Sequence, residues 1–156
     1  IGCRHGVGIV DHIEDRIVGL KVRDIYEVPA AAIILTAHAE LERLVGTIHQ
    51  NQFKGDLDRQ WGYLVYAGLW WEPLRENLDA FMDSVNERVT GTIGLKLFKG
   101  SVRAVTRESP NAVYDASLAT FETSGGLFSQ QASPGFIELW SLQSRMAHRL
   151  RASQQG

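Results

Sequence analysis

The residues best suited to bind a ligand lie in residues 6–29, where charged side chains alternate with apolar ones. Glu14 and Tyr26 fall on short strand-like segments among further charged residues: Asp15, Arg16, Lys21, Arg23, Asp24 and Glu27. Charged groups this dense among apolar strand residues need partners or solvent. The pattern leaves two alternatives open, a solvated sheet edge and a polar pocket that binds a zwitterion.

Other reactive residue types lack the spacing that their chemistry needs. His38 and Glu40 are two positions apart on an expected helix, so they point in different directions and do not form a metal-binding pair. Cys3 stands beside Arg4 and His5, which favours a thiolate, but we expect no shaped pocket so close to a chain end. We therefore predict no catalytic residue and no metal ligand in this chain.

A glycine loop, Ser124-Gly125-Gly126-Leu127, has the residue types of the phosphate-binding loop in pyrophosphatase-type nucleotide-binding domains. Such loops hold phosphates with backbone N–H groups and a helix N-terminus. Here no buried parallel strand precedes the loop, and Phe128-Ser129-Gln130 does not open an amphipathic helix. We predict an ordinary loop and no nucleotide-binding residue.

Hydrophobic periodicity predicts the elements that position these residues. Two or three short strands are expected before Pro29, with Gly19 at a bend. The remaining expected elements are helices over 29–49, 56–67 and from 72 toward Gly91, a hairpin over 93–106 that turns at Lys99-Gly100, and a last helix over 134–150 that Ser133 caps. Segregated strands and helices indicate a single α+β domain of short strands, a three-helix block, a β-hairpin and a C-terminal helix.

Composition narrows the possible partners. The chain has 156 residues and a formal charge of -2, so it carries no global positive field for nucleic acid. Its longest apolar run, Val28 to Leu35, is far shorter than the ~20 residues of a membrane helix. With Cys3 as the only cysteine, no intrachain disulfide forms. The absence of an apolar signal segment leads us to expect a cytoplasmic protein.

The last expected helix favours self-association. Leu139, Leu142, Met146 and Leu150 form a narrow apolar stripe, and the outer half of the helix is basic. Such a helix either folds onto its own domain or lies on an acidic partner surface, which an identical subunit can supply. The tryptophans Trp61, Trp70, Trp71 and Trp140 fit core packing or a subunit interface better than base stacking.

Short motifs along almost the whole chain resemble those of one enzyme family, the argininosuccinate synthases. The matching motifs are Arg4-His5-Gly6-Val7-Gly8, Asp11 to Lys21, Arg23 to Pro29, Thr36-Ala37-His38, Leu64 to Trp70, Val89-Thr90-Gly91, Ser117 to Phe121 and Gly135-Phe136-Ile137. The resemblance is to the C-terminal part of that enzyme. Its ATP-binding N-terminal domain has no counterpart in this chain, and Ser124 to Leu127 does not match the family's own phosphate loop.

The resemblance implies a ligase that joins citrulline to aspartate, cleaves ATP to AMP and pyrophosphate, and serves arginine biosynthesis. It implies that Glu14 and Tyr26 contact citrulline, that ATP is a co-substrate with Mg in the whole enzyme, and that this chain alone binds neither and is inactive. It further implies a homotetramer, with residues 1–133 as the catalytic and substrate domain and 134–156 as an oligomerisation helix and tail. The alternative is a non-catalytic assembly or regulatory module with the same fold.

The chain departs from the family pattern beside the expected substrate residues. The family usually has Arg where Ile9 stands, Ser where Val22 stands, and Gly where Ala30 and Ala31 stand. A basic residue and a hydroxyl are thus lost near Glu14 and Tyr26, which leaves two alternatives open, an unchanged substrate and a changed one.

Overall fold

The computed structural model describes residues 1–118 and 128–154, so the glycine loop Ser124 to Leu127 lies outside the described residues. The chain divides into two compact units, Ile1–Tyr114 and Asp115–Gly156, and each is considered by itself. Helices and antiparallel strands occupy separate stretches of the sequence, which confirms the α+β class. The predicted boundary between residues 133 and 134 falls inside the second unit and stays a prediction.

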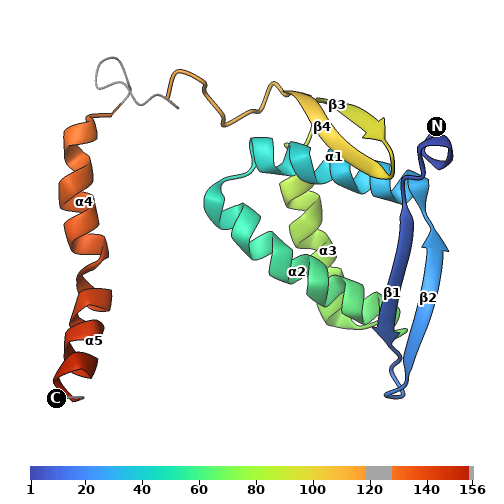
Figure 1. The fold of residues 1–156 in the computed structure, drawn as a ribbon, viewed down its shortest axis with the longest axis horizontal. Coiled ribbons are helices and arrows are strands. Elements are labelled where there is room, and N and C mark those ends of the chain that lie inside the picture. The colour runs from blue at the N-terminus through green and yellow to red at the C-terminus, as the bar shows by residue number, and fades with distance from the viewer. Residues whose placement is uncertain (119–127, 155–156) are drawn as a thin grey trace. The chain divides into compact units, whose positions relative to one another are not determined.

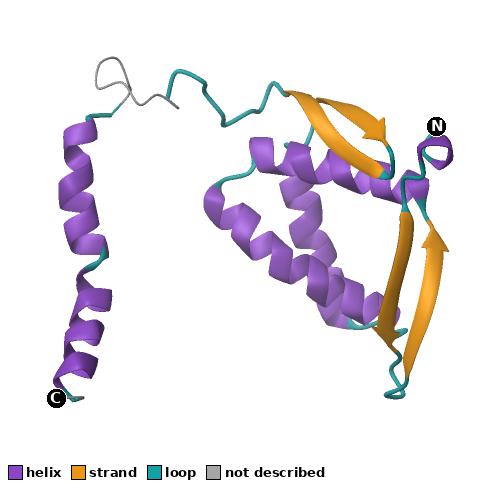
Figure 2. Ribbon diagram, in the orientation of Figure 1, coloured by secondary structure: helices purple, strands orange, loops and turns teal. Residues whose placement is uncertain are grey.

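The first unit contains two β-hairpins and three helices (Figures 1 and 2). A 3₁₀ turn over Cys3–His5 precedes them. The elements in chain order are β1 (Ile9–Asp15), β2 (Lys21–Glu27), α1 (Pro29–Val45), α2 (Ile48–Tyr66), α3 (Pro73–Asn86), β3 (Thr92–Phe98) and β4 (Ser101–Glu108).

Both hairpins turn where the sequence predicts. Gly19 has φ +83° and donates its N–H to the carbonyl of Arg16, which closes the turn between β1 and β2. Lys99 and Gly100 both have positive φ, 45° and 82°, the conformation of a tight turn whose twist matches the flanking strands. The β3–β4 pairing shifts register between Gly94 and Leu95.

The boundary between the first two helices differs from the expected one. Helix α1 ends at Val45, and α2 begins at Ile48 instead of residue 56. The side chain of Thr47 accepts a hydrogen bond from the N–H of Gln50, and the Gln50 side chain accepts one from the N–H of Thr47. This reciprocal cap starts a new helix, and it explains why the helical periodicity predicted through residue 49 stops early.

Helix α1 packs against β3 and β4, and α2 packs against α3 (Figure 1). The buried apolar side chains of the described residues are Val7, Leu41, Val45, Leu57 and Leu64. A polar cluster ties α2 to α3, since the Trp61 indole donates to Asp79 at 2.7 Å and Arg75 pairs with the same carboxylate. These contacts hold the C-terminal end of α2, which faces the first hairpin.

The second unit contains a 3₁₀ turn over Gln130–Ala132 followed by α4 (Ser133–Trp140) and α5 (Leu142–Ser153). The expected Ser133 cap is wrong, because the preceding turn runs directly into the helix and Ser133 is already helical. The side chain of Ser129 accepts the N–H of Gln131 at the start of that turn instead. The expected continuous helix is interrupted at Ser141, whose hydroxyl donates back to the Glu138 carbonyl.

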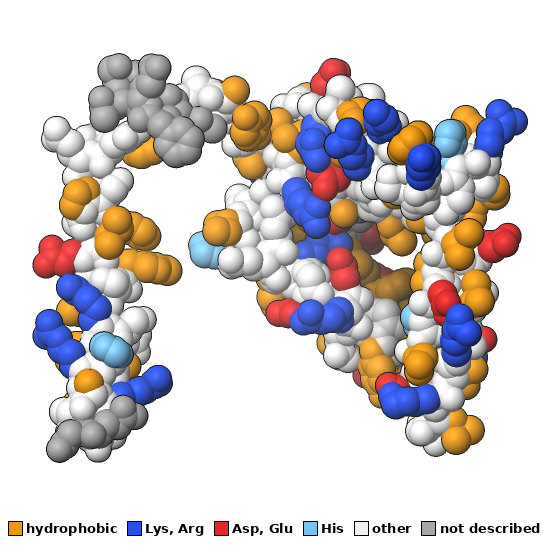
Figure 3. All heavy atoms as spheres, in the orientation of Figure 1, with side chains coloured by type: hydrophobic (Ala, Val, Ile, Leu, Met, Phe, Trp, Pro, Cys, Tyr) orange, Lys and Arg blue, Asp and Glu red, His pale blue; other side chains and the backbone are white. Residues whose placement is uncertain are grey.

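The apolar stripe of the second unit is exposed. Leu139, Trp140, Met146 and Leu150 are all exposed within this unit considered by itself. Figure 3 shows hydrophobic side chains gathered on α4, with cationic side chains following on α5. Among the described residues, no helix is long and apolar enough to cross a membrane.

Candidate functional site

The β1–β2 hairpin separates its side chains into two chemically different faces. The strands pair with Val10 opposite Tyr26, His12 opposite Asp24, and Glu14 opposite Val22. Paired residues in an antiparallel ladder lie on the same face, and successive residues alternate between faces. Glu14, Asp24 and Tyr26 therefore share one face.

The opposite face carries isoleucines and two exposed ion pairs. Arg23 Nη2 lies 2.6 Å from Asp11 Oδ2, and Lys21 Nζ lies 2.5 Å from Asp15 Oδ1. The hydrogen bond from Arg23 holds the pKa of Asp11 below its usual value. This face fits the solvated edge, one of the two alternatives that the sequence left open.

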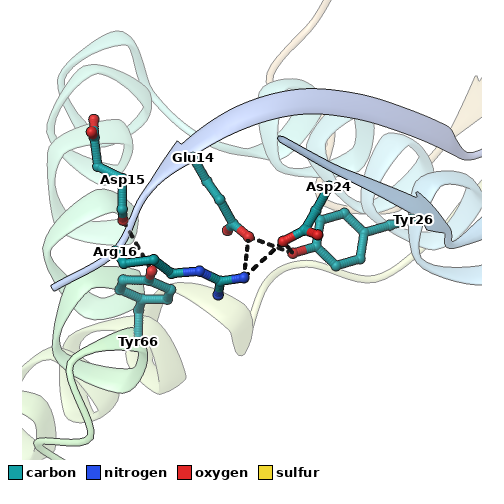
Figure 4. A network of polar contacts seen from close by, with 6 residues as sticks. All are labelled: Glu14, Asp15, Arg16, Asp24, Tyr26 and Tyr66. Atoms are coloured by element: carbon teal, nitrogen blue, oxygen red, sulfur yellow. Dashed lines mark hydrogen bonds and ion pairs between the residues drawn. The ribbon is translucent and has the colours of Figure 1, made fainter. Parts of the chain in front are cut away.

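The first face carries a compact polar cluster around Glu14 (Figure 4). The Tyr26 hydroxyl donates to Glu14 Oε1 at 2.7 Å, and its oxygen lies 3.4 Å from Asp24 Oδ2. The Glu14 side chain is 17% exposed, against 71% for the adjacent Asp15. The structure thus brings together Glu14 and Tyr26, the two residues that the sequence singled out.

Arg16 completes the cluster. Its Nη2 atom lies 2.7 Å from Asp24 Oδ2 and 3.1 Å from Glu14 Oε1. The negative charge of Glu14 is the largest cause that raises the pKa of Arg16, with further contributions from Tyr66 and Asp24. The guanidinium group is therefore a fixed positive charge between two carboxylates.

Helix α2 supports the end of this hairpin. The hydroxyl of Tyr66, the last residue of α2, donates to the backbone carbonyl of Asp15 at 3.0 Å. Figure 4 shows the Tyr66 ring beside the Arg16 side chain. The end of β1, and with it Arg16, is consequently anchored to the helical part of the first unit.

The proton on Tyr26 limits what the cluster can bind. The hydrogen bond to Glu14 is the main cause that raises the pKa of Tyr26 from 10.0 to about 12, with desolvation and the Asp24 charge adding to it. The phenol therefore stays protonated at neutral pH and directs its proton to Glu14. Glu14 and Tyr26 together offer lone pairs, which suit a ligand ammonium or other N–H donor.

Sequence reasoning missed the roles of Arg16 and Asp24. It treated them as flanking charges together with Asp15 and Lys21, because the spacing alone did not fix the register. With Gly19 in the turn, each pair of opposed residues is either even-numbered in both strands or odd-numbered in both. The even-numbered charged residues therefore share the face of the cluster, and the odd-numbered ion pairs lie on the other face. That parity was the signal available in the sequence.

The strand register also places two of the residues that depart from the family pattern on different faces of the hairpin. Ile9 pairs with Glu27 and lies on the face opposite the cluster. Val22 pairs directly with Glu14 and shares its face. Of these two positions, Val22 alone borders the polar cluster through the strand pairing.

The other candidates are not brought together into a metal-binding group in the described residues. His38 lies 3.3 Å from Glu42, one helical turn away, instead of joining Glu40. Within residues 1–118 and 128–154, no group of three or more His, Cys, Asp or Glu side chains could hold a metal ion. Cys3 is exposed.

Comparison with known proteins identifies the family of this chain. A family model described as the arginosuccinate synthase C-terminal domain matches residues 1–147. The argininosuccinate synthase of Pyrococcus furiosus is 46% identical over 150 residues, which are 96% of this chain and 36% of that protein. That of Methanopyrus kandleri is 47% identical over 147 residues, 94% of this chain and 37% of that protein.

An argininosuccinate synthase from Listeria monocytogenes is 46% identical over 147 residues, again 94% of this chain and 36% of its own length. The chain thus spans little more than a third of the curated relatives that it matches. Both the matched model and the extent of identity lead to one conclusion: this chain belongs to the argininosuccinate synthase family and corresponds to its C-terminal domain.

Proposed function

We propose that this chain supplies the citrulline-binding and oligomerisation part of an argininosuccinate synthase-like ligase. The hydrogen bond between Glu14 and Tyr26 carries the proposal, because it creates an acceptor pair at the two positions where the family resemblance implies citrulline contacts. Glu14 would accept hydrogen bonds from an ammonium group, and Tyr26 would accept one through a lone pair.

The proposed reaction condenses citrulline with aspartate at the expense of ATP. A ureido carbonyl carbon is a poor electrophile because two nitrogens donate electrons into it. Its oxygen therefore attacks the α-phosphorus of ATP and releases pyrophosphate, which gives citrullyl-AMP. The aspartate amine then attacks the activated carbon, AMP leaves, and loss of a proton gives argininosuccinate. This chain would contribute positioning of citrulline, which lowers the entropic cost of the first attack.

ATP and aspartate would be bound elsewhere in a complete ligase, and Mg would accompany ATP. No group of three or more acidic, His or Cys side chains in the described part of this chain fits a metal ion, and we assign no step to a metal held here. We expect the chain alone neither to bind nor to cleave ATP. A cytoplasmic location and a homotetramer remain predictions that agree with the family resemblance.

A chimera tests the proposal. Residues 1–147 would replace the matching segment of the Pyrococcus furiosus synthase, and AMP release would be measured with citrulline, aspartate and ATP. We expect release that requires both amino acids. A folded chimera without such activity would contradict the ligase assignment and favour the non-catalytic assembly module.

Glu14→Gln in the active chimera tests the site itself. The amide keeps the size of the side chain but loses the charge that pairs with an ammonium, so we expect the KM for citrulline to rise roughly 10- to 100-fold. The KM for ATP should change little. Lys21→Gln is the matched control, because it removes an exposed charge from the opposite face of the same hairpin. An unchanged citrulline KM in Glu14→Gln would mean that Glu14 serves the fold only.

A further inference from the structure

The polar cluster contains two carboxylates, but the Tyr26 hydroxyl can donate a hydrogen bond to only one of them. Glu14 and Asp24 both face the Tyr26 hydroxyl, at 2.7 Å and 3.4 Å, but a hydroxyl has a single proton to donate. The shorter distance shows that Glu14 receives it. Asp24 must therefore be satisfied by another group.

Arg16 is that group, and it touches both carboxylates through one nitrogen. Arg16 Nη2 lies 2.7 Å from Asp24 Oδ2 and 3.1 Å from Glu14 Oε1, the same oxygen that accepts the Tyr26 proton. The guanidinium charge offsets the repulsion between the carboxylates, and it engages Asp24 so that the Tyr26 hydroxyl keeps donating to Glu14. The formal charge of the three side chains is then -1, from one cation and two anions.

We propose that Arg16 is a positioning residue, which with Asp24 holds the Glu14 carboxylate on Tyr26 in the geometry that receives the substrate. This inference rests on the proposed function of Glu14 and Tyr26 as citrulline contacts. Arg16 acts through Glu14 and does not need to touch the substrate. Tyr66 helps to keep it in place, because its hydroxyl binds the Asp15 carbonyl at the neighbouring residue.

Charge substitutions in the active chimera test the proposal. In Arg16→Gln the two carboxylates repel each other, so we expect the citrulline KM to rise about tenfold, the effect of one charge-assisted hydrogen bond. The kcat and the KM for ATP should change less than about twofold. Arg16→Lys should recover much of the loss, because it keeps the charge.

The double variant Arg16→Gln/Asp24→Asn separates positioning from direct contact. It restores a formal charge of -1 to the cluster without a cation, so we expect the citrulline KM to return toward the wild-type value. If Arg16 instead binds the substrate directly, Asp24→Asn brings no recovery. That result, or an unchanged KM in Arg16→Gln, would overturn the proposal.

A spectroscopic measurement on the 156-residue chain decides the positioning role independently of activity. The Cζ carbon of ¹³C-labelled Tyr26, assigned with Tyr26→Phe, reports the hydrogen bond to Glu14. We expect its resonance to move toward that of free tyrosine in Arg16→Gln, less so in Arg16→Lys, and not in the Lys21→Gln control.

The two tests distinguish failure of the citrulline site from failure of the positioning role. An unchanged citrulline KM in Glu14→Gln, together with a shifted Tyr26 resonance in Arg16→Gln, would reject the citrulline site and keep the positioning role. A raised KM in Glu14→Gln with an unmoved resonance and KM in Arg16→Gln would reject the positioning role alone.

Discussion

At the scale of single residues, we expect Tyr26 to act as a selective acceptor, because its own proton is already engaged with Glu14. A free phenol can donate to a ligand carboxylate or accept from a ligand ammonium. Donation to Glu14 removes the first option and leaves the lone pairs. The pair should therefore discriminate between the two charged ends of an amino acid, preferring the ammonium end.

The raised pKa of Tyr26 also makes the stability of the folded state depend on pH in the alkaline range. The unfolded chain releases this phenol proton near pH 10.0, whereas the folded chain keeps it up to about pH 12. The raised pKa thus stabilises the folded state fully below pH 10, and this contribution is lost as the pH rises from 10 through 12.

We expect the free energy of unfolding in urea to fall more steeply between about pH 10 and about pH 12 in the wild type than in Tyr26→Phe. The other titrating groups are common to both proteins, so the difference isolates Tyr26. Parallel curves for the two proteins would show that the hydrogen bond to Glu14 does not persist in solution.

The sequence singled out Glu14 and Tyr26, which the structure joins by a hydrogen bond, but it did not predict the network around them. Residue types and the family resemblance identified the pair. The roles of Arg16 and Asp24 depend on strand register and on a turn in which Arg16 folds back toward β2. Such contacts across a hairpin follow from three-dimensional pairing, which local periodicity does not specify.

At the scale of the elements, the start of α2 depends on a cap that periodicity alone did not reveal. The polar stretch from Ile48 to Gly55 has little apolar patterning, so the helix was expected to begin only at residue 56. The pattern Thr47-x-x-Gln50 is nevertheless a capping-box sequence, and it was the available signal. The helix consequently begins about two turns before the expected start.

Thr47→Ala tests this cap. The substitution removes the acceptor for the Gln50 N–H, so we expect the chain to lose ~1 kcal/mol of unfolding free energy, measured by urea denaturation followed by circular dichroism. Thr47→Ser keeps the hydroxyl and should stay close to the wild type. Equal losses in both variants would point to packing of the Thr47 methyl group instead of the cap.

The interruption at Ser141 could not be predicted for a related reason. The apolar stripe continues from Leu139 to Leu142 with helical spacing, so the pattern gives no sign of a break. In the structure Ser141 and Arg145 both donate to the carbonyl of Glu138, at 3.3 Å and 3.0 Å. Competition between side-chain and backbone donors is invisible to hydrophobic periodicity.

At the scale of the whole molecule, exposed apolar side chains in the second unit support the proposed self-association. The α4–α5 pair has leucine, methionine and tryptophan side chains in solvent, and the free energy falls when a partner covers them. The basic side chains of α5 can select a partner surface of opposite charge. An identical subunit is the occupant that the family resemblance favours.

Removal of residues 135–156 tests this proposal. We expect light scattering at micromolar concentration to show an oligomer for the full chain and a smaller species for the truncated one. Circular dichroism should retain most of the helical signal, since α1, α2 and α3 remain. A deletion of residues 152–156 alone is the matched control. A full chain that is already monomeric would contradict the prediction.

Trp140 gives the same region an optical property of its own. Its indole stacks on the Phe136 ring with centroids 5.5 Å apart, remains 78% exposed, and is the only indole after residue 114. Emission from an indole moves to shorter wavelength when water leaves its surroundings. The chain therefore carries an intrinsic fluorophore at the surface that we expect a neighbouring subunit to cover. A shift of the Trp140 emission to shorter wavelength would report assembly without an added label.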